Sequence, residues 1–207
     1  MKTNEIYVSN NGYGLEEALT ETEKYADYRQ LIGKEKIHLR LIAEEMLGMV
    51  ETIAGDFEAN FWIDDDDKAY YAHLNAAMLM DSKIRSTLIE TSTSGRNAAA
   101  KGIMGKIRDV FQAFMAGRND TVTVLSENYG GYSGDGLSGT GAFSSTNIWS
   151  LSCYKETVQG RKSDDKIEKW DELEKSIIAN IADDVTVGIK GNNVEMVITK
   201  KWKTGKK

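Results

Sequence analysis

Proline is absent from this chain of 207 residues, and cysteine occurs only once, at Cys153. A single cysteine excludes an intramolecular disulfide and fits a reducing compartment. Long apolar runs are missing too: none approaches the roughly 18 residues of a membrane-spanning helix, and the first residues lack the apolar core of a signal peptide. We therefore expect a cytoplasmic protein without a membrane partner.

Histidine is also scarce. His38 and His73 are the only two, and their spacing from Cys153 matches no common zinc-ligand pattern. Two histidines leave room for a Ser-His-Asp or Cys-His enzyme, but no nucleophile motif accompanies them. Acidic residues outnumber basic residues, and the net charge is −6. Because nucleic-acid binding requires neutralisation of phosphates by basic residues, we expect no nucleic-acid partner.

The composition that is present suits a globular domain. Hydrophobic residues make up 41% of the chain and charged residues 28%, which is enough to bury a core without disulfides or metals. We predict a single domain over 1–207, with a glycine-rich insertion at about 118–165. The glycine-rich stretch 128–141 is interpreted either as a functional lid or as irregular surface.

Apolar periodicity predicts the main elements of this domain. Residues spaced at helical intervals predict helices at 15–32, 37–53, 81–94, 103–117 and 169–182. Alternating residues predict strands at 4–9, 57–64, 68–79 and 121–126 and a hairpin of two strands at 184–202. The segment 148–158 fits a strand or the start of a helix. The acidic run Asp64–Asp67 is interpreted as a hairpin turn, because it lacks the ligand spacing of a calcium loop.

One acid interrupts an apolar stripe. In "LIAEEMLGMV", residues 41–50, Glu45 lies on the side of Ile42 and Met49, whereas Glu44 points further toward water. Glu45 is either a boundary residue that reaches solvent or a lysine, or a carboxylate that lines a pocket.

The predicted order of elements is strand, helix, helix, strand, strand, helix, irregular loop, helix, strand, strand. This order resembles the ATP-binding fold of the GHKL superfamily, which includes gyrase, histidine kinases, mismatch-repair ATPases and anti-sigma-factor serine kinases. The resemblance covers roughly 4–116 and 168–202. It implies an α/β (α+β) two-layer sandwich, in which helices cover one face of a mixed, mainly antiparallel sheet.

Two motifs of that superfamily are partly represented. Its first motif has a glutamate that activates water and, four residues later, an asparagine that holds Mg²⁺; here Glu45 and Met49 occupy these positions, and a thioether is a poor ligand for Mg²⁺. Its second motif receives the adenine amino group on an aspartate and lets the base approach at a glycine. Asn75, Ala77 and Asp81 stand at the positions of the aspartate, the glycine and the last acid, and an asparagine carbonyl can still accept that hydrogen bond.

The third motif is a glycine-rich lid before a helix, which holds phosphates. The segment 94–106 precedes a helix and carries Arg96, Asn97, Lys101 and Lys106, so backbone amides and cations there suit a phosphate. An interhelical turn with exposed lysines is the alternative. The segment 128–141 competes for the lid role, although it carries no cation.

The resemblance implies a regulatory signalling protein of bacterial anti-sigma type with a degenerate ATP-binding domain. We expect it to act through a protein partner and to bind ATP or ADP weakly or not at all, without Mg²⁺. An active ATPase or serine kinase, and a binder of another small ligand in the remodelled pocket, are the alternatives. The sequence does not identify the partner, the ligand or the oligomeric state.

Overall fold

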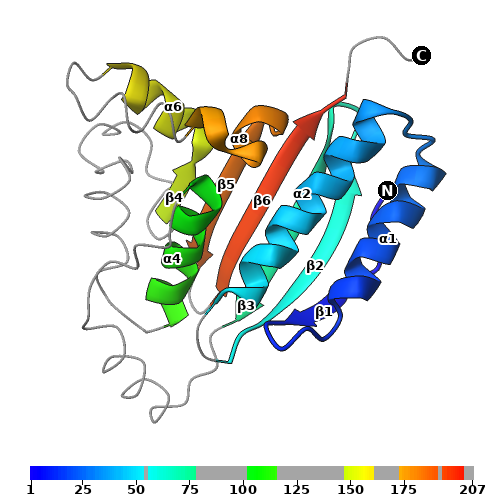
Figure 1. Cartoon of the computed structure of the whole chain (residues 1–207), viewed down its shortest axis with the longest axis horizontal. Helices are drawn as coiled ribbons and strands as arrows, with labels where there is room; N and C mark the ends of the chain where they lie inside the picture. Colours follow the sequence, from blue (N-terminus) through cyan, green and yellow to red (C-terminus); the bar gives the residue numbers. More distant parts are fainter. Residues whose placement is uncertain (54–55, 78–101, 116–146, 161–172, 191–192, 203–207) are drawn as a thin grey trace.

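The computed structural model describes residues 1–53, 56–77, 102–115, 147–160, 173–190 and 193–202. The elements in chain order are β1 (Ile6–Ser9), α1 (Leu15–Tyr28), α2 (Lys34–Glu51), β2 (Glu58–Asp65), β3 (Ala69–Ala77), α4 (Ile103–Met115), β4 (Asn147–Ser150), α6 (Leu151–Gly160), α8 (Ile177–Ile181), β5 (Asp184–Lys190) and β6 (Asn193–Lys201). They form two layers, a sheet and a set of helices packed on one of its faces (Figure 1).

The sheet has six strands in the order β1-β2-β3-β6-β5-β4. All five pairings are antiparallel, so the described part of the sheet has no parallel pair, although the sequence had suggested a mixed sheet. The predicted two-layer α/β sandwich is confirmed. The carboxyl-terminal hairpin lies in the same sheet as β2 and β3, because β6 pairs with β3 along its length.

Alternation along the strands separates the two faces of the sheet. In β2, Phe61 and Ile63 are buried, and in β3, Leu74 and Ala76 are buried. Their neighbours, such as Trp62, are less buried and point to the opposite face, because successive side chains of a strand alternate between faces. The described helices all cover the first face, which therefore holds the core (Figure 1).

Helix α2 lies over the centre of the sheet, with α1 on one side and α4 and α8 on the other (Figure 1). Its buried stripe includes Leu39, Ile42, Met46 and Val50, all fully buried, and it follows the helical spacing. Because of this stripe, α2 packs against the sheet. Glu45 lies at the edge of the stripe.

The structure resolves one open alternative and corrects one expected element. The segment 148–158 contains both alternatives, since β4 is followed directly by α6. The helix predicted over 169–182 is wrong as one continuous helix: Ser176 interrupts it, and its hydroxyl accepts a hydrogen bond from the Ala179 amide at 3.2 Å as the N-cap of α8. The helix predicted at 81–94, the strand at 121–126 and the glycine-rich stretch 128–141 lie outside the described residues.

Candidate functional site

Glu45 lies at the edge of the buried stripe of α2, and it is partly exposed. Burial raises the pKa of its carboxyl group, and the nearby charge of Glu44 raises it further. Arg40 marks the flank toward α1, because it bonds to Glu23 of that helix and to Glu44 at 2.7 Å. Glu45 is about 140° around the helix from Arg40, so it lies on the flank that α2 turns toward α4 and α8.

Met49, one turn after Glu45, is only 4% exposed and belongs to the hydrophobic core. A buried thioether presents no oxygen to a hard cation such as Mg²⁺. Within the described residues, moreover, no group of three His, Cys, Asp or Glu side chains is placed to hold a metal ion. The position that the resemblance assigns to a metal ligand therefore acts as a packing position.

Asn75 and Ala77 lie on β3. Their neighbours Leu74 and Ala76 are buried against the helices, so Asn75 and Ala77 point to the other face of the sheet. Asn75 lies opposite Asn60 of β2 and Glu195 of β6 in the sheet. The structure does not bring these two residues together with Glu45, because the sheet itself separates them.

Lys106 is the one basic candidate of the segment 94–106 that falls within the described residues. Its ammonium group donates a hydrogen bond to the Tyr154 hydroxyl at 2.5 Å and lies 4.5 Å from the centre of the Tyr154 ring. These contacts link α4 to α6. The remaining candidates lie outside the described residues: Asp81, Arg96, Asn97 and Lys101.

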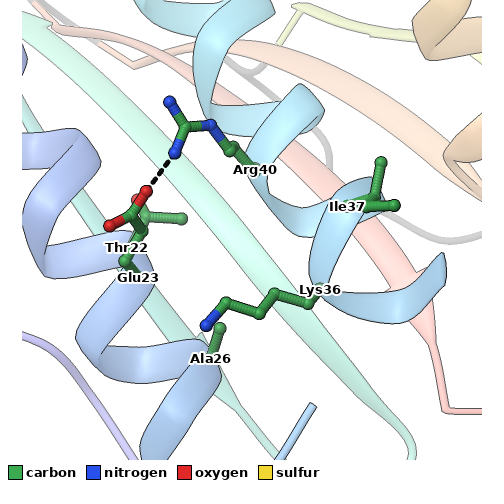
Figure 2. A pocket seen from close by; sticks show the side chains of 6 residues that line it. All are labelled: Thr22, Glu23, Ala26, Lys36, Ile37 and Arg40. Carbon is green, nitrogen blue, oxygen red and sulfur yellow. Dashed lines mark hydrogen bonds and ion pairs between the residues drawn. The ribbon is translucent and has the colours of Figure 1, made fainter. Parts of the chain in front are cut away.

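A groove that the sequence analysis missed runs between α1 and α2 (Figure 2). Its volume is about 220 Å³, and most of its exposed lining surface is apolar. It is lined by Thr22, Glu23 and Ala26 of α1 and by Lys36, Ile37 and Arg40 of α2. Two ion pairs connect the helices beside it, Glu23 with Arg40 and Asp27 with Lys36.

Large apolar side chains are exposed near the groove, around the turn that joins the two helices. Tyr28 is 69% exposed, Ile32 68% and Ile37 56%. Ile37 faces away from the buried stripe of α2, which is the signal by which the sequence could have identified this surface. We call Tyr28, Ile32, Ile37 and the adjoining groove the hairpin surface.

Comparison of the chain with protein-family models finds no match, and no curated protein or solved structure matches it either. Among the described helices, none combines the length and the apolar character that crossing a membrane requires. The geometry of the chain itself therefore carries the functional argument.

Proposed function

We propose that this protein is a regulatory module that acts by binding a protein partner through the hairpin surface. In this proposal the domain is a degenerate relative of the GHKL ATP-binding domains, it works in the cytoplasm, and it binds ATP or ADP weakly or not at all. The observation that carries the proposal is the size and lining of the groove between α1 and α2, together with the exposed apolar residues beside it.

The groove suits a side chain better than a nucleotide. Pockets for small molecules usually measure about 300–1,000 Å³, and this groove has a volume of about 220 Å³. Its apolar lining matches an aliphatic or aromatic anchor from a partner, while Tyr28, Ile32 and Ile37 extend the apolar contact beyond it. An apolar residue of a partner helix or loop is the occupant that we propose.

Two further observations support the proposal that the domain binds nucleotides weakly or not at all. Glu45 and Asn75 lie on opposite sides of the sheet, so they cannot contact the base and the phosphates of one nucleotide together. Met49 is buried and presents a sulfur where an oxygen ligand is needed.

The second candidate is an active ATPase or serine kinase, and Glu45 is the residue that favours it. A carboxyl group whose pKa is raised by burial suits a general base. Turnover of ATP that depends on Mg²⁺ and on Glu45 would support this candidate. A small ligand other than a nucleotide, bound beside Glu45, is the third.

Photo-cross-linking tests the protein-binding proposal. A photoreactive amino acid at position 32 in the hairpin surface should form one discrete adduct with a partner protein in cells, and the substitution Ile37→Asp in the same chain should abolish it. The matched control carries the photoreactive group at position 177, where Ile177 is also exposed but lies on α8. Equal adducts from both positions, or an adduct that Ile37→Asp leaves unchanged, would overturn the proposal.

A further inference from the structure

The face of the sheet opposite the described helices carries an unusual set of side chains. Antiparallel sheets commonly present one polar face to water. Here, neighbouring strands place Trp62 of β2 directly opposite His73 of β3, and their rings stack with centroids 4.6 Å apart and an angle of 6° between planes. The centre of this face is therefore aromatic.

Carboxylates flank the stacked rings. Asp64 Oδ1 lies 3.3 Å from His73 Nε2, and Glu195 Oε1 lies 3.2 Å from His73 Nδ1. The two acids come from the strands on either side of β3, and their side chains are 35% and 42% exposed. Each carboxylate therefore has further acceptor sites available to a donor from solvent or from a partner. Glu58 adds a third acid on the same face of β2.

The protein already places one of its own cations on this surface. The ammonium group of Lys2 lies 4.8 Å from the centre of the Trp62 ring, and it pairs with Glu5 at 2.6 Å. Both side chains of this ion pair are about half exposed, so the contact forms at the surface. Attraction between a cation and the face of an indole is weak at such an exposed site, so another cation can compete for the same place.

We infer that this face binds a basic segment of a partner protein, whose arginine or lysine replaces Lys2 over Trp62 while its neighbouring basic residues pair with Asp64 and Glu195. Arginine fits best, because its planar guanidinium group stacks on aromatic rings and forms paired hydrogen bonds with carboxylates. The acids that surround the rings repel phosphates, so the charge of this face favours a peptide over a nucleic acid.

This inference does not depend on the hairpin surface, which lies in the helical layer on the other side of the sheet. The two proposals can therefore fail separately. The following experiment uses the full chain and reads only the binding of a basic peptide.

The test measures fluorescence anisotropy of a labelled nonapeptide of alternating arginine and glycine at constant ionic strength. The double variant Asp64→Asn with Glu195→Gln should weaken binding at least about fivefold, since two ion pairs are lost. Its control, Glu17→Gln with Glu51→Gln, changes the net charge equally but on exposed positions of α1 and α2. This control should alter binding less than about twofold.

Lys2→Ala provides a second variant that leaves both carboxylates in place. Removing the competing ammonium should tighten binding about threefold beyond the effect of Lys24→Ala, which removes an equal charge from α1. The inference is overturned if Lys2→Ala and Lys24→Ala change the affinity for the peptide equally. It is equally overturned if the double variant Asp64→Asn with Glu195→Gln binds the peptide as tightly as its control does. It is also overturned if an oligothymidylate of the same length binds more tightly than the peptide.

Discussion

At the scale of single residues, Asp65 holds the end of β2 against α1. Its side chain is fully buried, and it accepts hydrogen bonds from Arg29 Nε at 2.6 Å, from the amino group of Met1 at 2.7 Å and from the Tyr25 hydroxyl. Burial alone would raise the pKa of Asp65, but the hydrogen bonds from Arg29, the Met1 amino group and Tyr25 outweigh it and hold the pKa below its usual range.

The substitution Asp65→Asn should therefore lower the free energy of unfolding by about 2–3 kcal/mol at pH 7, somewhat less than for a fully buried pair because Arg29 is partly exposed. A carboxyl group with a lowered native pKa stabilises the fold above its unfolded pKa of about 4 and loses that contribution as the pH falls through the native value. Urea unfolding at several pH values checks both points. A difference between variant and wild type that stayed constant down to pH 2 would contradict this account.

Glu45 should show the opposite pH dependence. Because its native pKa is raised, the folded state binds its proton more tightly than the unfolded state does, and ionisation above the unfolded pKa destabilises the fold. Glu45→Gln should therefore leave stability unchanged at pH 3 and increase it slightly at pH 7. The gain should not exceed about 0.5 kcal/mol, because solvent screens a carboxylate that is partly exposed.

Thermal unfolding of Glu45→Gln and Glu45→Ala at pH 3 and pH 7 tests this predicted change in stability. Both variants should remain close to wild type if Glu45 faces a solvated space. A loss of about 1–3 kcal/mol in Glu45→Ala would mean instead that its carboxyl group satisfies buried donors, and would favour a purely structural role.

At the scale of elements, one glycine precedes α2 and another lies inside it, and the two affect the helix in opposite ways. Gly33 precedes the helix with φ 56° and ψ −125°, a conformation that residues with a Cβ atom rarely adopt. Gly48 lies inside the helix, where a Cβ atom would meet nothing within 4 Å. Gly33 therefore permits the backbone turn from which α2 begins, beside the hairpin surface, whereas Gly48 only weakens the helix.

Gly33→Ala should cost about 1–2 kcal/mol through backbone strain alone, since a Cβ atom there would meet no neighbour within 4 Å either. Gly48→Ala should instead stabilise the protein by about 0.5–1 kcal/mol, because alanine loses less backbone entropy in a helix. The two variants add the same methyl group to the same element, so each serves as the control for the other. Midpoints of guanidinium unfolding measure them, and shifts of equal sign would refute the distinction.

At the scale of the whole molecule, one sheet presents two surfaces of different character. Helices cover one face and form the hairpin surface at their outer side, while the other face carries the stacked pair of Trp62 and His73. Among the described residues, Glu45 and Asn75 belong to the one nucleotide pocket that the GHKL resemblance implies, but they lie on different sides of the sheet. This separation supports our proposal that the protein acts through a protein partner.

We accordingly expect no hydrolysis of ATP above background in the presence of Mg²⁺. We also expect ATP or ADP at 1 mM to leave the unfolding temperature nearly unchanged. A ligand with a Kd of about 10 μM would add about 2.7 kcal/mol of stability at that concentration, so binding of this strength would be visible. Robust turnover that disappears in Glu45→Gln would refute the prediction and support the ATPase or serine kinase.

The sequence by itself determined most of the described elements and the sides on which their apolar residues lie. The stripe from Leu39 to Val50 and the alternation around Phe61 are local patterns, and burial in a two-layer fold follows from them because periods of 3.6 and 2 place apolar residues on one side. The partial burial of Glu45 was predictable for the same reason. Ser176 shows the limit of such patterns, since a single capping hydroxyl interrupted an apolar period that continued past it.

The tertiary structure alone decided which residues meet. His73 contacts Glu195, 122 positions away, because β6 pairs with β3 in a register that no local pattern specifies. Asn75 and Glu45 are separated for a related reason: a shift of one residue along a strand reverses the side of the sheet to which a side chain points. Chemistry at a site depends on this register and on the packing of layers, and both arise only when distant segments come together.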